Sequence, residues 1–251
     1  MNLCKLKETV QKNNIYYLMG ILTLLFLKLF YAKASCEALR WILGPTARFV
    51  TLMTGISFSY EPDMGYVNHS LKYVIAPSCS GVRFLIILIA MLIFSFVHRA
   101  KKGFLWTVLS LPASYVLTVL VNVLRIILSI YVPLFLGQTG FYSSSLTQDT
   151  LHTAIGTATY FASLLVIYHL TDTYFVKPSG KQKKSRNLQY LVPAFWYFMI
   201  VLGIPFLNHA STKGGEKFTG YATLISFVCL PILLLFCLIG TIRKHSKVLL
   251  P

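Results

Sequence analysis

The sequence predicts an all-α, polytopic membrane protein with about six to eight transmembrane helices. Three observations lead to this prediction: 56% of the 251 residues are apolar, only 12% are charged, and the mean hydropathy is +0.67. Soluble domains carry about 25% charged residues. A soluble globule of this length is therefore excluded, and residues 1–251 are expected to form a single membrane-embedded domain.

Six apolar segments are candidates for membrane spans, because a helix needs about 20 mostly apolar residues to cross the hydrocarbon core. They are residues 15–32, 82–97, 104–124, 151–170, 190–207 and 221–242. The first segment is too long for the apolar part of a cleavable signal peptide, and no clear small-residue cleavage site follows it. We therefore expect it to be retained as a membrane helix.

The cations of the chain predict how these spans are oriented. The net charge of +16 comes from 23 Lys and Arg against 7 Asp and Glu. Most cations lie in four clusters: Lys5, Lys7 and Lys12; Arg99, Lys101 and Lys102; Lys177, Lys181, Lys183, Lys184 and Arg186; Arg243, Lys244 and Lys247. Cytoplasmic loops are enriched in Lys and Arg, so alternating spans place all four clusters and both termini in the cytoplasm. The charge thus predicts topology, and no nucleic-acid partner is expected.

Two segments do not fit a simple span. Residues 35–58 mix apolar residues with charges, Gly and Pro, so we expect either one helix at the outer interface or a broken pair of short helices. Residues 104–136 would form a helix about 50 Å long. We therefore expect a turn near Arg125, where the helix emerges on the outer side, and a short outer or re-entrant piece over residues 126–136.

Four ionisable residues lie at or within apolar segments: Cys79, Arg83, Arg125 and His152. A charge at membrane depth costs about 2.5–3.5 kcal/mol on insertion scales, so each of these residues requires an explanation. The alternating spans place Cys79, Arg125 and His152 at one depth on the outer side. The five cysteines show no CxxC and no ligand-like spacing, so neither a disulfide framework nor a zinc site is indicated, and no cofactor is expected.

Cys79 lies in the segment APSCSG, just before the span at 82–97. Pro77 blocks a helix upstream, Ser78 or Ser80 can cap the helix that follows, and Gly81 allows close approach of another backbone or a substrate. A helix N-terminus favours the thiolate form of a cysteine. Cys79 is therefore either an activated nucleophile or a buried structural cysteine.

His152 and Arg125 have the chemistry that a nucleophilic cysteine needs. His152 begins the span at 151–170, and Asp149 can cap that helix or orient the imidazole. Arg125 ends the segment Asn122-Val-Leu-Arg and presents several donors to a carboxylate or a developing oxyanion. Taken singly, His152 fits an interfacial helix start, and Arg125 fits an anchor that snorkels to the headgroups.

These segments resemble a known family. PSCSGVR at 77–83, NVLR at 122–125, and His152 followed by Gly156 resemble the three signature segments of the exosortase/archaeosortase family, most like its exosortase K branch, over about residues 60–170. Many members carry a small hydroxyl residue where this chain has Phe84. The resemblance implies these roles: nucleophile, Cys79; transition-state or substrate-positioning arginine, Arg125; proton-transfer residue, His152; accessory residues, Ser80, Gly81, Asn122 and Asp149.

The resemblance also implies a function. Family members are polytopic cysteine transpeptidases of the cell membrane that cleave a C-terminal sorting signal, made of a short motif, a membrane helix and a basic tail. The expected partners are such an exported protein, the lipid bilayer and an unidentified surface acceptor, with the active site on the extracytoplasmic face and a Cys79 thioester as intermediate. Two alternatives stay open: a small-molecule transporter, although carboxylates are nearly absent from the spans, and a non-catalytic assembly protein with an unreactive Cys79.

Overall fold

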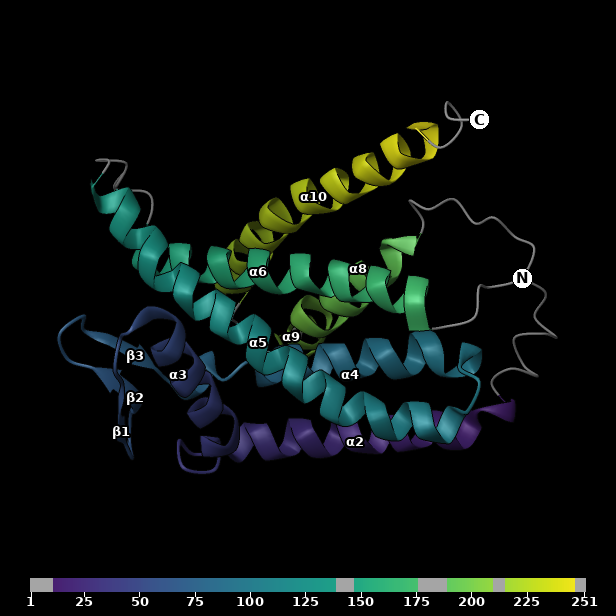
Figure 1. The fold of residues 1–251 in the computed structure, drawn as a ribbon, viewed down its shortest axis with the longest axis horizontal. Helices are drawn as coiled ribbons and strands as arrows, with labels where there is room; N and C mark the ends of the chain where they lie inside the picture. Colours follow the sequence, from purple (N-terminus) through teal and green to yellow (C-terminus); the bar gives the residue numbers. More distant parts are fainter. Residues whose placement is uncertain (1–10, 139–146, 176–188, 210–214, 247–251) are drawn as a thin grey trace. The chain divides into compact units, whose positions relative to one another are not determined.

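The structure is a computed structural model that describes residues 11–138, 147–175, 189–209 and 215–246 (Figure 1). Lys5, Lys7, Lys247 and the cation cluster at 177–186 lie outside the described residues, so the membrane orientation stays a prediction. The chain divides into two compact units. Unit 1 contains Met1–Gly20, Ile89–Ser110 and Phe161–Pro251, and unit 2 contains Ile21–Leu88 and Leu111–Tyr160. The single domain expected over residues 1–251 stays a prediction.

Helices make up most of the described chain. They are α2 (Asn14–Lys33), α3 (Arg40–Thr54), α4 (Val82–Phe96), α5 (Gly103–Gln138), α6 (Gln148–Leu170), α8 (Leu191–Phe198), α9 (Ile204–His209) and α10 (Gly215–Ser246). Within the described residues, five helical stretches are long and apolar enough to cross a membrane: Asn14–Lys33, Pro77–Arg99, Gly103–Gly137, Asp149–Phe175 and Phe218–Thr241. A shorter apolar stretch covers Leu191–Phe206. These stretches correspond to the six predicted segments, and the helical membrane class is confirmed.

Helix α5 runs without interruption for 36 residues. The predicted turn near Arg125 and the separate piece at 126–136 are therefore wrong. The prolines inside the helix are Pro112 and Pro133, and the residues between them include neither Gly nor Pro. A proline removes one helical hydrogen bond, a loss that membrane helices tolerate. At 1.5 Å per residue the helix is about 54 Å long. A helix of this length fits a membrane by tilting or by extending beyond the hydrocarbon core. Arg125 is an interior residue of α5 and not its end.

Residues 35–58 contain one helix, α3 (Arg40–Thr54), and not a broken pair. Its buried face includes Ile42, Thr46 and Val50, spaced four residues apart as one helix face requires. The large apolar side chains on its other faces, Trp41, Phe49, Leu52 and Met53, are exposed, which suits the predicted position at a membrane interface. Gly55 ends the helix with a φ of +74° and donates its N–H to the Thr51 carbonyl at 2.8 Å.

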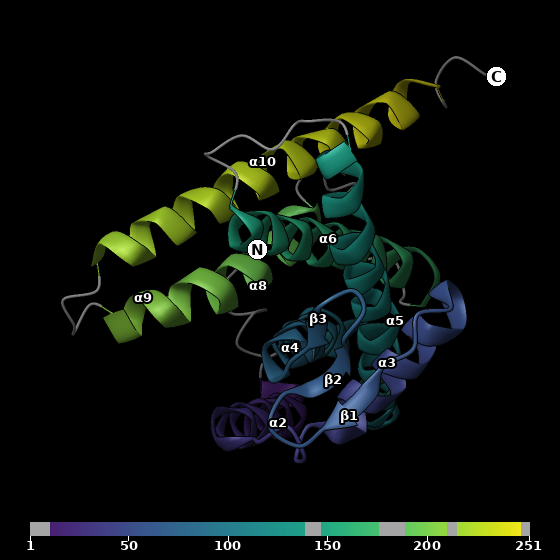
Figure 2. The ribbon, with the colours of Figure 1, turned by 90° about the vertical axis from the view of Figure 1, so that its left-hand side faces the viewer.

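A small antiparallel sheet follows α3, although an all-α chain was expected to contain no strands. Its strands are β1 (Ser59–Glu61), β2 (Gly65–Asn68) and β3 (Tyr73–Ile75), in the order β1-β2-β3. Figures 1 and 2 both show this sheet beside α3. Strand β3 leads into the single 3-10 turn η1 (Pro77–Cys79), and Ile75, Cys79 and Val82 belong to the hydrophobic core of unit 2 together with residues of α3 and α5. The sheet therefore fixes where Cys79 enters the core.

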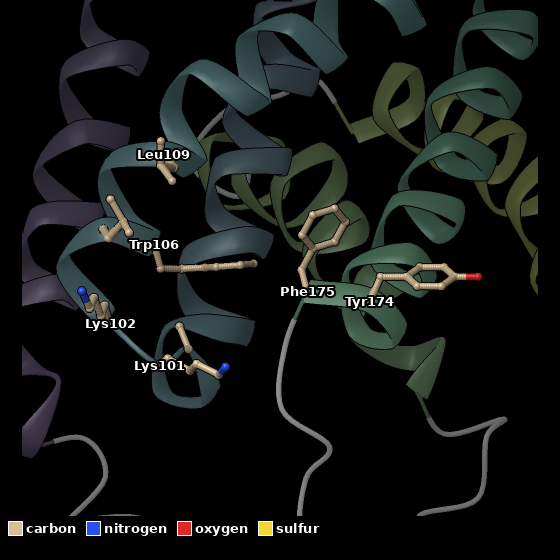
Figure 3. Close-up of a pocket in the computed structure, with 8 residues that line it drawn as sticks. Lys101, Lys102, Trp106, Leu109, Tyr174 and Phe175 are labelled. Carbon is tan, nitrogen blue, oxygen red and sulfur yellow. The ribbon is translucent and has the colours of Figure 1, made fainter.

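Unit 1 contains a cavity of about 520 Å³ near the start of α5 (Figure 3). Ala100, Lys101, Lys102, Leu105, Trp106, Leu109, Tyr174 and Phe175 line it. The last two come from the π-helical turn η3 (Thr171–Phe175), where Asp172 forms an ion pair with Arg99. Lysines mixed with aromatic side chains are typical of the membrane–water boundary.

Candidate active site

Cys79 is held at the junction between η1 and α4. Pro77 opens the 3-10 turn, and the Cys79 N–H donates to the Ala76 carbonyl at 2.8 Å. Gly81 has a φ of +78°, so the chain can turn sharply into α4 after Cys79. The Ser80 hydroxyl accepts the Val82 N–H at 3.5 Å, so Ser80 acts as the cap, one of the two predicted options. Cys79 is 6% exposed.

A stripe of buried polar residues runs along one face of α5. Its members within unit 2 are Ser114, Thr118, Asn122, Arg125 and Ser129, spaced three or four residues apart as neighbours on a helix face are. Asn122 is fully buried and donates its side-chain amide to the carbonyl oxygen of Cys79 at 2.8 Å. A Cβ on Gly81 would lie 3.2 Å from Asn122 Cγ. The glycine therefore lets the Cys79 segment approach α5 closely.

Helix α6 contributes three residues at intervals of four: His152, Gly156 and Tyr160. His152 Nε2 lies 3.7 Å from the Cys79 sulfur, and the Tyr160 hydroxyl donates to Asn122 Oδ1 at 2.7 Å. Thr147 caps α6, because its hydroxyl accepts the Thr150 N–H at 3.3 Å. Asp149 is exposed in the first turn, so capping by Asp149 is corrected to Thr147, and its role in orienting His152 stays a prediction.

Arg125 connects the two helices at the centre of this site. Its guanidinium donates through Nη1 to the Tyr160 hydroxyl at 3.1 Å and through Nη2 to His152 Nε2 at 3.0 Å. Its Cζ also lies 5.2 Å from the centre of the Tyr160 ring. Arg125 is only 8% exposed, and neither of these hydrogen-bond partners is an acid. Its positive charge is thus not neutralised by them and remains available to an anionic group.

The structure brings together most of the predicted site residues. Cys79, Arg125, His152, Asn122 and Gly81 lie in one network, and Ser80 caps the helix beside it. Arg83, also singled out in the sequence, is exposed.

Two contributors were missed: Tyr160 and Thr118. Tyr160 lies eight residues after His152 on the same helix face, so helical spacing could have found it. Its ring stacks on Phe84 with centroids 4.8 Å apart, which gives a structural role to the residue that departs from the family pattern. Thr118 belongs to the polar stripe of α5.

Within the described part of the chain, no group of three or more His, Cys, Asp or Glu residues is arranged to hold a metal ion. The contacts of Cys79 and His152 are with each other, with Arg125 and with Asn122. A thiol next to an imidazole, with a buried guanidinium alongside, is an arrangement that can perform nucleophilic acyl transfer.

Comparison with known proteins identifies the family. The family model for transmembrane exosortase matches residues 15–169, which is more than half of the chain and includes Cys79, Arg125 and His152. No curated protein and no solved structure matches the chain. The resemblance noted in the sequence is thereby confirmed at the level of the family, and the exosortase K branch stays a prediction. The chain is a multi-pass membrane protein that belongs to the transmembrane exosortase family.

Proposed function

We propose that the protein is a cysteine transpeptidase that cleaves a C-terminal sorting signal of exported proteins on the extracytoplasmic face of the membrane. The main support is the convergence of Cys79, His152 and Arg125 within a single network of unit 2. Three residues far apart in the sequence come from the η1 turn, α6 and α5, and each supplies a different function that acyl transfer requires. The family match gives independent support for a membrane protein of this class.

The first step is attack of Cys79 on a peptide carbonyl. Arg125 has only N–H donors, so Nε2 of His152 accepts its hydrogen bond and a neutral imidazole carries its proton on Nδ1. The lone pair of Nε2 can then take the Cys79 proton while sulfur bonds to the carbonyl carbon. Arg125 contributes positive charge beside the developing oxyanion.

The second step releases the sorting signal. The tetrahedral intermediate collapses, the carbon–nitrogen bond breaks, and the proton on His152 Nε2 passes to the leaving amine. The exported protein is then a thioester on Cys79. A nucleophile on a surface acceptor attacks this thioester, the carbon–sulfur bond breaks, and the thiol is regenerated; attack by water would give hydrolysis instead.

Replacement of Cys79 tests this proposal in cells. The assay is processing of a co-expressed exported protein that ends in a short motif, an apolar helix and a basic tail, followed by the mass of its C-terminus. We expect Cys79→Ala to abolish processing, since alanine supplies no nucleophile. Cys36→Ala is the matched control, because Cys36 is another buried free cysteine of unit 2 whose thiol contacts the Asp63 carbonyl. Normal processing by Cys79→Ala would refute a catalytic role and favour an assembly function.

A further inference from the structure

Helix α6 faces Arg125 with three residues on successive turns: His152, Gly156 and Tyr160. Nη2 of Arg125 donates to His152 Nε2 at 3.0 Å, and Nη1 donates to the Tyr160 hydroxyl at 3.1 Å. A Cβ at Gly156, between these two residues, would lie 2.8 Å from Arg125 Nε, so the guanidinium packs against the backbone of α6 there. Both terminal nitrogens of the arginine are thus held by side chains of one helix.

The hydrogen bonds that begin at Arg125 and pass through Tyr160 run in one direction. A guanidinium only donates, so the Tyr160 oxygen accepts from Nη1 and directs its own proton to Asn122 Oδ1 at 2.7 Å. The amide oxygen of Asn122 is thereby engaged, and its Nδ2 donates to the Cys79 carbonyl at 2.8 Å. The Tyr160 hydroxyl therefore joins Arg125 to the segment that carries Cys79.

The ring of Tyr160 is held independently of its hydroxyl. It stacks on the fully buried Phe84, with ring centroids 4.8 Å apart and planes 13° from parallel. Arg125 Cζ also lies 5.2 Å from the centre of the Tyr160 ring. Phenylalanine can keep both ring contacts, because it lacks only the hydroxyl. Tyr160→Phe therefore removes the hydrogen bonds to Arg125 and Asn122 and retains the packing.

The bond from Arg125 to Tyr160 does not depend on the protonation of His152. In the proposed reaction, Nε2 of His152 takes the Cys79 proton, and a protonated Nε2 cannot accept a hydrogen bond from Nη2. Nη1 keeps its acceptor, because the phenol oxygen still has a lone pair for it. Tyr160 then holds the guanidinium while negative charge develops on the substrate carbonyl oxygen.

We infer that Tyr160 is a positioning residue, whose hydroxyl holds Arg125 beside the reacting carbonyl and directs the Asn122 amide to the Cys79 backbone. This inference rests on the proposed transpeptidase function. Tyr160 makes and breaks no covalent bond, and it acts through Arg125. Misplacement of a catalytic group by about 1 Å can cost about 100-fold in rate, so loss of this one hydroxyl should slow acyl transfer measurably.

Two small probes separate acyl transfer from thiol reactivity without knowledge of the natural substrate. 4-Nitrophenyl acetate acetylates a thiol through a tetrahedral oxyanion: a sulfur–carbon bond forms, the ester carbon–oxygen bond breaks, and 4-nitrophenolate leaves. Iodoacetamide alkylates a thiol by displacement of iodide at a saturated carbon, with no oxyanion. The full-length protein in lipid nanodiscs is treated with each probe, and modification of Cys79 is followed by mass spectrometry. We expect Tyr160→Phe to slow acetylation by at least about tenfold and to leave alkylation unchanged.

Combination with a substitution of Arg125 tests whether Tyr160 acts through the arginine. Arg125→Ala should itself slow acetylation by about 10²–10³-fold, as for loss of an oxyanion donor. Addition of Tyr160→Phe to this variant should cause no further loss, because the guanidinium that Tyr160 positions is absent and the effects of coupled residues do not add. Equal fold losses from Tyr160→Phe with and without Arg125 would overturn the inference, because the hydroxyl would then act independently of the arginine.

Tyr115→Phe is the matched control. Tyr115 of α5 also stacks on an aromatic ring, that of Trp41 with centroids 5.5 Å apart, and its hydroxyl donates to the Trp41 carbonyl at 2.8 Å. The control therefore loses a hydroxyl hydrogen bond of similar length in the same unit, but one that leads to a backbone carbonyl of α3 and not to Arg125. Both probe rates should be unchanged in this variant.

Each other outcome has a definite meaning. Acetylation of Tyr160→Phe at the wild-type rate overturns the inference and leaves the proposed function intact. Parallel loss of acetylation and alkylation also overturns it, because the hydroxyl would then act on the thiol or on folding. Absence of any Cys79 acetylation in the wild-type protein refutes the proposed function and the inference with it.

Discussion

Nη2 of Arg125 donates to Nε2 of His152 at 3.0 Å, and this is the same imidazole nitrogen that faces the Cys79 sulfur at 3.7 Å. A guanidinium cannot accept a hydrogen bond, so the contact exists only while Nε2 is unprotonated. Once Nε2 takes the cysteine proton, two cations face each other and the donor of Arg125 must turn away. In the proposed reaction, proton transfer from Cys79 would therefore release an arginine donor next to the substrate carbonyl.

Replacement of Arg125 by lysine should abolish this arrangement although it keeps the charge. The planar guanidinium contacts Tyr160 and His152 at once, and a single ammonium group cannot reproduce that fork. We expect Arg125→Lys to lower processing of a co-expressed substrate by about 100-fold or more, in the range found for loss of an oxyanion donor. Arg83→Lys, at an exposed position, should process normally. Equal activity of the two variants would show that only charge is needed at Arg125.

Loss of the Asn122 side chain should destabilise the segment that carries Cys79. Asn122 donates to the buried Cys79 carbonyl and accepts from Tyr160. Asn122→Ala leaves that carbonyl without this donor, and an unsatisfied buried polar group costs about 1–3 kcal/mol. The midpoint of thermal unfolding in detergent measures the loss.

Asn68→Ala provides the comparison for Asn122. Asn68 makes the same kind of bond, from its amide to the Ser57 carbonyl at 2.7 Å, but at an exposed site. Its removal should cost less than about 0.5 kcal/mol. Equal shifts of the unfolding midpoint in the two variants would contradict the importance of burial at Asn122.

The conformation of Gly81 allows a prediction that separates strain from packing. Gly81 and Gly55 have φ angles of +78° and +74°, so alanine at either position pays about 1–2 kcal/mol for a left-handed backbone. A Cβ at Gly81 would also meet Asn122 and Thr118 at 3.2 Å, whereas at Gly55 nothing lies within 4 Å.

Gly81→Ala should therefore lower the unfolding midpoint more than Gly55→Ala does, by an extra cost of about 1–3 kcal/mol for overpacking. It should also slow alkylation of the Cys79 thiol by iodoacetamide, because the added methyl group pushes the segment that carries Cys79 away from α5. If both alanine variants shift the midpoint equally, backbone strain alone accounts for the destabilisation and overpacking at Gly81 is refuted.

The sequence was sufficient to predict the membrane spans and the proximity of Cys79, Arg125 and His152, because both follow from the hydropathy and order of the segments. Hydropathy marks each span, and alternation of spans brings Cys79 and His152 to one depth. Arg125 was placed correctly with them for a partly wrong reason, because the expected end of its helix is an interior position of α5. Segment length alone could not distinguish a turn from one long helix.

The remaining features depend on contacts between distant segments. The strands β1 to β3 have only three or four residues each, too few for a clear alternation, so the sheet could not be predicted. The polar stripe that contains Asn122 and Ser129 and the spacing of His152 and Tyr160 were readable as helix faces. Which faces turn toward each other is decided by packing, and for that the three-dimensional structure is needed.

The last prediction concerns Gly156, whose missing side chain gives Arg125 its place. A Cβ there would lie 2.8 Å from Nε of Arg125, and the guanidinium cannot move aside without loss of its bonds to Tyr160 and His152. Gly156→Ala should therefore lower processing by about 100-fold, as for loss of an oxyanion donor. Gly137→Ala is the matched control, because Gly137 is also within a helix and nothing lies within 4 Å of its Cβ position. Alanine there should stabilise the helix by up to about 1 kcal/mol and leave processing unchanged. Full processing by Gly156→Ala would mean that the position of Arg125 is not critical for the reaction.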